Sequence, residues 1–236
     1  MRSQLLATVS VFALVDAASA ADMAAMPVKA PPAVVQVLSW TGPYIGINGG
    51  AVWHRTTSSY ELIGGGILSD SARTTSTGPT FGGQLGYNWQ RQNWVIGVEV
   101  DANWVDASKT VTGPAGVVFH NKLSWLATAR ARLGVTLAPP TLVYATGGLA
   151  VGKVKNVADG SGLNSPILEH SKTKVGWTAG GGIEHMFSRN WTGKIEALYV
   201  DLGKDTVSVP VPPDSTYVGH FKNTAVIVRA GLNLKW

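Results

Sequence analysis

Apolar and polar residues alternate one by one along several long stretches of this chain. In the stretch 94–104, for example, Val98 and Val100 alternate with Glu99 and Asp101. Strict alternation is typical of a β-strand with one apolar face. Eight such stretches, each of roughly 10–14 residues, begin near residues 44, 80, 94, 122, 142, 173, 191 and 223. Strands of globular domains usually have about 5–6 residues, whereas a tilted strand that crosses hydrocarbon needs about 9–11.

The polar faces of these stretches carry too many charges for the inside of a β-sandwich. We therefore expect the apolar face to meet lipid and the polar face to line a barrel interior, the reverse of a soluble barrel. In the stretch 142–154 both faces are similarly apolar, so its inward face stays open. A soluble eight-stranded barrel is the alternative.

The spacing of the stretches alternates between long and short connections. Short connections are expected at 90–93, 138–141 and 188–190, and long ones near 56–79, 105–121, 156–171 and 203–222. Outer-membrane barrels combine short periplasmic turns with long external loops. The chain is thus predicted to form an all-β fold, an eight-stranded antiparallel transmembrane β-barrel with short periplasmic turns and long external loops.

The predicted interior contains four acidic and four basic side chains. Because an unpaired buried charge costs several kcal/mol, a network of ion pairs is expected, with Arg130 and Arg132 each holding a carboxylate bidentately. Acid/base catalysis by neighbouring carboxylates is the less favoured interpretation, and a filled lumen disfavours a wide pore. The predicted lumen charge network consists of Glu99, Asp101, Arg130, Arg132, Glu184, Lys194, Glu196 and Arg229.

The nine tryptophans are predicted to form two aromatic belts, because indole rings prefer the headgroup level of a bilayer. The alternative is that they fill a core. The predicted periplasmic belt is Trp40, Trp89, Trp94, Trp191 and Trp236, and the external belt is Trp53, Trp104, Trp125 and Trp177.

The N-terminus has the features of a secretory signal peptide. An apolar stretch at 5–15 is followed by Ala18-Ser19-Ala20, so residues 1–20 are predicted to be cleaved. Residues 21–39 are rich in proline and alanine and are predicted to be an extended periplasmic linker, with the cell wall as a candidate contact. The barrel is expected to span 40–236. The uncharged run 133–152 contains two adjacent prolines, which disfavour a membrane helix there.

Composition excludes several other classes of protein. The chain has no cysteine, which rules out a disulfide scaffold, a zinc ribbon and a cysteine nucleophile. Charged residues are 14% of the chain, against about 25% in a typical soluble domain. The net charge of +5 is spread thinly, so no nucleic-acid partner is expected.

Seven short motifs occur in order along the chain: SWTGPYIG at 39–46, GQLGYNWQ at 83–90, GVEVD at 97–101, ARARLG at 129–134, YATGGLA at 144–150, NW at 190–191 with LYVDLG at 198–203, and VRAGLNLKW at 228–236. Together they resemble the small, porin-like eight-stranded outer-membrane proteins of alphaproteobacteria, the major outer-membrane surface antigen type. The chain departs from that family at Pro43, where an aromatic residue is usual, and at Trp236, where phenylalanine is usual.

The resemblance implies a Gram-negative outer-membrane protein in contact with lipid and lipopolysaccharide, without catalytic residues. It also implies that the barrel-assembly machinery recognises the C-terminal strand. Members of the family resemble structural or antigenic surface proteins, and a few relatives bind haemin.

Motifs for catalysis or nucleotide binding are missing from the sequence. Accordingly no enzyme activity, cofactor or metal is expected. One speculative site remains, because four histidines fall near the external strand ends and imidazole can ligate haem iron or a metal. These are His54, His120, His170 and His220, and the plainer interpretation is that they are loop residues without a shared ligand.

The leading functional prediction is an outer-membrane structural barrel and surface-exposed protein without catalysis. The alternatives are a small porin for ions or small solutes and a haemin-binding surface receptor. A membrane-embedded enzyme would need a histidine beside a hydroxyl or carboxylate at the rim.

Overall fold

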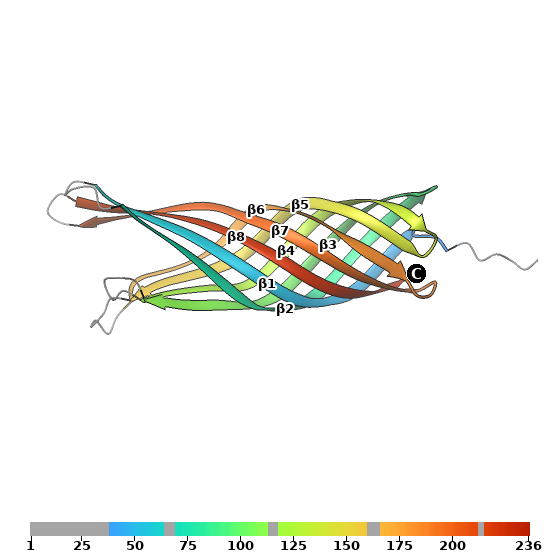
Figure 1. The fold of residues 1–236 in the computed structure, drawn as a ribbon, viewed down its shortest axis with the longest axis horizontal. Helices are drawn as coiled ribbons and strands as arrows, with labels where there is room; N and C mark the ends of the chain where they lie inside the picture. Colours follow the sequence, from blue (N-terminus) through green and yellow to red (C-terminus); the bar gives the residue numbers. More distant parts are fainter. Residues whose placement is uncertain (1–37, 64–68, 113–117, 160–165, 212–214) are drawn as a thin grey trace, which may run out of the picture. The chain divides into compact units, whose positions relative to one another are not determined.

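The computed structural model describes residues 38–63, 69–112, 118–159, 166–211 and 215–236. These residues form one barrel of eight long strands (Figure 1). The strands are β1 (Gly42–Ile63), β2 (Ser69–Arg91), β3 (Trp94–Thr112), β4 (Val118–Ala138), β5 (Thr141–Asp159), β6 (Pro166–Met186), β7 (Trp191–Val211) and β8 (Ser215–Lys235).

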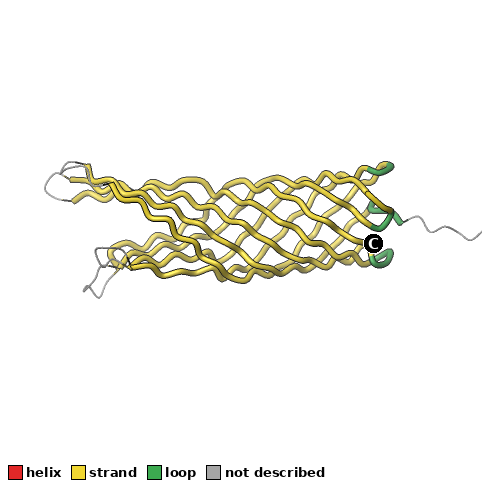
Figure 2. Tube along the Cα trace, viewed as in Figure 1, coloured by secondary structure: helices red, strands yellow, loops and turns green. Residues whose placement is uncertain are grey.

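Every strand pairs antiparallel with its neighbours in sequence, and β1 pairs with β8 to close the barrel. Figure 2 shows the long strands and the short turns that join them at one end. The closing register runs from Tyr44–Lys235 to Ile63–Thr216. This arrangement confirms the predicted fold class. Among the residues that the structure describes, no helix is long and apolar enough to cross a membrane.

The faces of the strands follow the predicted alternation over most of the barrel. Apolar side chains such as Ile47 (69% exposed) and Ile195 point outward, whereas Glu99, Arg130 and Glu196 are buried inside. The barrel therefore presents an apolar outer surface, which suits contact with hydrocarbon.

On β3, Trp94 and Trp104 mark the two ends of the apolar outer face, and both are exposed. Ten residues separate them, which gives about 34 Å along the strand and about 26 Å across a bilayer at a tilt of about 40°. This height matches the apolar band of about 25 Å that outer-membrane barrels show.

A β-bulge reverses the predicted faces at the start of β4. The register with β5 shifts between Leu123 and Trp125, so that Leu123 points inward and is fully buried, while Lys122 points outward. The opposite was predicted, because one extra residue in a strand inverts the alternation beyond it. In β5 the structure resolves the open question, since Leu142, Tyr144 and the even-numbered residues up to 154 face inward.

The strands have 19 to 23 residues and are much longer than predicted. Most of each predicted long connection is paired strand: in the segment 105–121, for example, β3 continues to Thr112 and β4 begins at Val118. Outside the bilayer both faces of a strand meet water, so the sequence no longer alternates there. The short connections lie where they were predicted.

The barrel wall opens along two seams at the end opposite the short turns. The pairing of β2 with β3 ends at Thr80–Val105, and that of β6 with β7 ends at Trp177–Asp201. Beyond these points the strands continue as two four-stranded sheets, which are visible as separate groups in Figure 1. We call them extension 1 (β7, β8, β1 and β2) and extension 2 (β3 to β6).

Two further bulges lie beside the seams. The register of β3 with β4 shifts between Trp104 and Ala107, and that of β7 with β8 shifts between Asp201 and Lys204. Within the second bulge, Gly203 has a φ of +77°, which favours glycine, and its N–H donates to Asp201 Oδ1 at 2.8 Å. Both bulges lie in strands that border a seam, β3 and β7, and a bulge bends the strand that carries it, which favours the division of the barrel at this level.

Residues 1–37 lie outside the described residues. They include the predicted signal peptide (1–20) and nearly all of the predicted linker (21–39), and both stay predictions. The described chain begins at Leu38, which packs against the end of the barrel.

Candidate functional site

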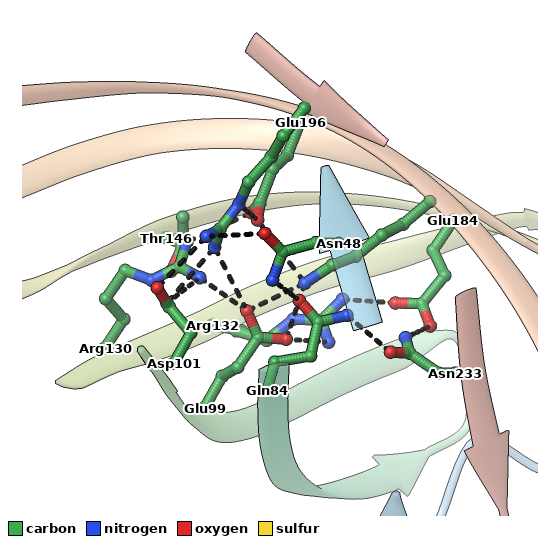
Figure 3. A network of polar contacts seen from close by, with 12 residues as sticks. Asn48, Gln84, Glu99, Asp101, Arg130, Arg132, Thr146, Glu184, Glu196 and Asn233 are labelled. Atoms are coloured by element: carbon green, nitrogen blue, oxygen red, sulfur yellow. Dashed lines mark hydrogen bonds and ion pairs between the residues drawn. The ribbon is translucent and has the colours of Figure 1, made fainter. Parts of the chain in front are cut away.

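Eight charged side chains meet inside the barrel, and all of them are buried (Figure 3). At the centre, Glu99 accepts hydrogen bonds from Lys194 Nζ at 2.8 Å and from Arg130 Nη2 at 2.5 Å. It also accepts one from the Tyr44 hydroxyl at 2.7 Å. We call the set the lumen network: Glu99, Asp101, Arg130, Arg132, Glu184, Lys194, Glu196 and Arg229.

One arginine pairs bidentately with a carboxylate, and it is not one of the two predicted. Arg229 Nη1 and Nη2 lie 3.0 and 3.1 Å from the two oxygens of Asp101. Arg130 instead bridges Glu99, Asp101 and Glu196. Arginines placed between several carboxylates join neighbouring strands into one charge-assisted unit.

Arg132 links the network to the short-turn end of the barrel. Its Nη2 donates to Glu184 at 2.5 Å, and Glu184 also accepts from the Thr192 hydroxyl and from Asn233. The Arg132 guanidinium lies 4.0 Å from the centre of the Tyr144 ring, within the range of a cation–π contact.

The four acidic and four basic members balance in charge. Each carboxylate is buried, and each has at least one cationic nitrogen within 3.0 Å. A general acid or base needs access to a substrate proton, whereas these carboxylates are enclosed and occupied. The arrangement therefore suits structural pairing and does not resemble an acid/base site.

Two tyrosines in the interior were not singled out from the sequence. Tyr44 packs over Gly86, where an added Cβ would lie 2.4 Å from the tyrosine hydroxyl oxygen, and Tyr144 packs over Gly182 in the same way. These inward glycines make room for the rings. These glycines lie on the polar faces of alternating strands, and this position was a signal that could have identified the contacts between tyrosine and glycine.

An apolar layer crosses the lumen beside the network, on the side of the extensions. Along β7 the inward residues change from Lys194 and Glu196 to Leu198, Val200 and Leu202. The layer was not predicted, because its residues share strands with the charged ones. Its members are Val52, Val105, Ala107, Leu123, Leu126, Ala150, Val154, Leu198, Val200, Leu202, Ala225 and Ile227.

Trp40 closes the opposite, short-turn end of the lumen and does not belong to an aromatic belt. It is 1% exposed and packs with Val95, Leu142, Tyr144 and Met186. Its backbone N–H donates to Gln90 Oε1 at 2.7 Å. The prediction placed it in the periplasmic belt because it precedes the first strand, but the chain there folds into the barrel mouth.

The other eight tryptophans are exposed on the outer surface. Trp104 lies directly opposite Trp125 on the neighbouring strand, and the ring of Phe81 lies 4.9 Å from that of Trp104. The exposed members are Trp89, Trp94, Trp191 and Trp236 at the short-turn end, and Trp53, Trp104, Trp125 and Trp177 at the other.

Of the four histidines predicted near the external rim, His54 and His220 have side chains that the structure describes, and these two lie in different environments. His54 is 1% exposed inside the barrel, and neither ring nitrogen has a hydrogen-bond partner among the described residues. His220 is exposed, and its Nδ1 lies 3.0 Å from the Thr206 hydroxyl. His120 and His170 lie in β4 and β6, but their side chains are outside what the structure describes.

In the described part of the chain, no group of three or more histidine, aspartate or glutamate side chains is arranged to hold a metal ion.

Comparison with known proteins agrees with this architecture. A family model described as an outer membrane protein beta-barrel domain matches residues 10–233. The chain is 38% identical to the 31 kDa outer-membrane immunogenic protein of Brucella melitensis, over the full length of both chains. It is 33% identical to the 25 kDa outer-membrane immunogenic protein of Brucella abortus, over 75% of this chain and 72% of the relative.

A shorter match and a solved structure complete the comparison. The 22 kDa outer membrane protein of Rhizobium leguminosarum is 37% identical over 51% of this chain and 52% of its own. The crystal structure of the outer membrane protein OprG from Pseudomonas aeruginosa matches with a TM-score of 0.52 at 14% identity, covering 83% of this chain and 96% of that one. It shows the same fold.

These relatives confirm the resemblance read from the seven motifs and the predicted location in the cell outer membrane. The short turns then lie on the periplasmic side and the two extensions on the external side. The chain belongs to the outer-membrane protein β-barrel family.

Proposed function

We propose that this outer-membrane barrel is a structural protein without catalysis, which holds its two extensions at the cell surface behind a closed lumen. The observation that carries the proposal is the filling of the interior by three successive layers: the cluster around Trp40, the lumen network and the apolar layer. The relatives named as immunogenic proteins are consistent with surface display.

Each layer opposes the passage of ions in a different way. The Trp40 cluster occupies the periplasmic mouth, and the lumen network joins charges from opposite walls, as in the contact of Arg229 with Asp101 at 3.0 Å. The side chains of the apolar layer have no polar atom that could replace the hydration shell of an ion, and apolar constrictions oppose the entry of water. A small porin would need all three to rearrange.

The alternative of a haemin receptor has little support from the geometry. His54 is enclosed within the barrel and His220 is exposed, so these two predicted ligands do not face a common group. The proposed function therefore includes no haemin or other cofactor.

Two partner predictions remain proposals. Trp236 is exposed at the end of β8, which suits recognition of the C-terminal strand by the barrel-assembly machinery. Contact of the segment 21–39 with the cell wall rests on its composition alone.

Liposome swelling tests the proposed function. The full-length mature protein is reconstituted into liposomes, and swelling in small sugars and salts is compared with that of protein-free liposomes. We expect equal rates. Swelling that increases with the amount of folded barrel would overturn the closed lumen and favour a porin.

A further inference from the structure

A buried histidine lies at the level where the two extensions begin. His54 of β1 pairs in register with Ser76 of β2, beyond Thr80, where the pairing of β2 with β3 ends. It is the next inward residue after Val52 of the apolar layer, on the external side of the membrane-spanning part. Its ring is enclosed, and neither nitrogen has a hydrogen-bond partner among the described residues. Buried polar side chains nearly always have such a partner, so His54 is an exception at the place where the barrel divides.

A cation from the other extension acts on this ring. Lys174 of β6 is buried, and its ammonium group disfavours a positive charge on His54. Asn223 of β8 is the polar neighbour that favours the charged ring, and its side-chain oxygen accepts a hydrogen bond from the Thr56 hydroxyl at 3.2 Å. The strands β3, β4 and β5 contribute uncharged residues to the adjoining apolar layer, the outermost being Ala107, Leu123 and Val154.

The same lysine joins the two extensions across a seam. The pairing of β6 with β7 ends at Trp177–Asp201. Beyond that point Lys174 Nζ lies 3.1 Å from Asp205 of β7, and Lys172 Nζ lies 3.9 Å from the same carboxylate. The bulge that contains Gly203 separates Asp205 from the paired part of β7, and a strand can bend at a bulge. Lys174 belongs to extension 2 and Asp205 to extension 1, so this ion pair spans the seam.

A proton on His54 would place a second buried cation beside Lys174. In the closed arrangement, burial lowers the pKa of His54 to about 4, while contact with Asn223 raises it in part and the charge of Lys174 lowers it. If the extensions part, water reaches the ring and its pKa returns to the ordinary value of 6.5. The arrangement with the higher pKa binds the proton more readily, so acid favours separation as the pH falls from about 6.5 to about 4. Above this window the ring is neutral in both arrangements.

We propose that the two extensions form an acid-sensitive contact at the cell surface: protonation of His54 repels Lys174, breaks its ion pair with Asp205 and parts the extensions along the seam between β6 and β7. The proton comes from the surrounding water, and no covalent bond changes. The lumen network and the Trp40 cluster lie nearer the periplasm and stay in place. The inference therefore concerns the external end alone and does not depend on whether the lumen conducts.

Spin labels measure the separation directly, because the chain has no cysteine of its own. Lys109→Cys in β3 and Ser208→Cys in β7 place one label on each extension, and both residues are exposed. The labelled full-length mature protein is folded into phospholipid nanodiscs, and double electron–electron resonance records the distance between the labels at pH 7.5 and pH 5. His54→Gln removes the titrating ring. His220→Gln is the matched control, because that histidine is exposed on extension 1.

We expect one distance at pH 7.5 and an additional, longer distance at pH 5. The ratio of the separated to the closed form should rise about 30-fold between these pH values, as follows from a pKa of 6.5 for the open ring and of about 4 for the closed one. In His54→Gln the ratio should change by less than about twofold, since no proton is taken up at this position. His220→Gln should respond as the parent protein does.

Three results would overturn the inference. They are an unchanged distance in the parent protein at pH 5, a full response in His54→Gln, and a loss of the response in His220→Gln. Heat-dependent gel migration verifies that each variant is folded at both pH values. If His54→Gln does not fold, His54→Leu takes its place with the same expectation, because leucine does not titrate and extends the apolar layer.

Discussion

Glutamine in place of Glu99 probes the lumen network at its centre. Glu99 holds Lys194 at 2.8 Å, Arg130 at 2.5 Å and the Tyr44 hydroxyl at 2.7 Å, and it is 1% exposed. Glutamine keeps the shape of the side chain but removes its charge, leaving four buried cations opposite three carboxylates. Breaking a buried ion pair by altering one partner costs about 3–5 kcal/mol, so we expect the free energy of unfolding to fall by about that amount.

A surface pair provides the control for this prediction. Asp106 lies 3.7 Å from Lys122, and both side chains are nearly half exposed. Asp106→Asn should therefore cost less than about 1 kcal/mol. Adding Lys194→Met to Glu99→Gln restores the charge balance and should recover part of the loss. The assay is reversible unfolding by urea in lipid vesicles, followed by tryptophan fluorescence and gel migration.

A loss below about 1 kcal/mol for Glu99→Gln would refute the reasoning. That result would mean that water fills the lumen and screens the network, as it screens exposed pairs. The same measurement therefore bears on whether the interior is closed.

Two further substitutions test the packing inside the barrel, and the same unfolding assay measures both. Trp40→Ala should lower the free energy of unfolding by about 3–5 kcal/mol, because it leaves a cavity at the periplasmic mouth. Trp94→Ala removes an exposed ring and should lower it clearly less. Equal losses would contradict the buried position of Trp40. Gly86→Ala should cost about 1–3 kcal/mol, since the added methyl would meet the Tyr44 ring. In contrast, an added Cβ at Gly83 would meet only the Gly46 carbonyl oxygen, at an ordinary contact distance of 3.7 Å. Gly83→Ala should therefore change stability by less than about 0.5 kcal/mol, and a loss comparable to that of Gly86→Ala would contradict the packing of Tyr44 over Gly86.

The sequence alone predicted the eight strands, their antiparallel order and the faces of most of them. The reason is physical: a strand between lipid and a polar interior has two different environments, and the alternation records them. Glu99 and Arg229 could be assigned to the interior from this pattern. Their partners could not, because strand register alone does not fix which long side chains meet across a lumen.

The prediction of which side chains point into the barrel failed or stayed open where the sequence does not clearly distinguish the two faces of a strand. Tyr144 lies in a strand whose faces are both apolar. Leu123 precedes a bulge that could not be predicted from the local residue pattern. Trp40 entered the lumen instead of the membrane surface, since tryptophan suits either place. The extensions were predicted to be loops, because apolar and polar residues need not alternate in paired strands that lie in water.

Conductance across a planar lipid bilayer tests the closed lumen most directly. Folded, full-length mature protein is added to one chamber, insertion is verified by recovery of the barrel from the membrane, and current is recorded at both polarities. A lumen filled by the Trp40 cluster, the lumen network and the apolar layer predicts no steady current above that of the protein-free bilayer. Stable, uniform current steps that appear with each inserted barrel would contradict it.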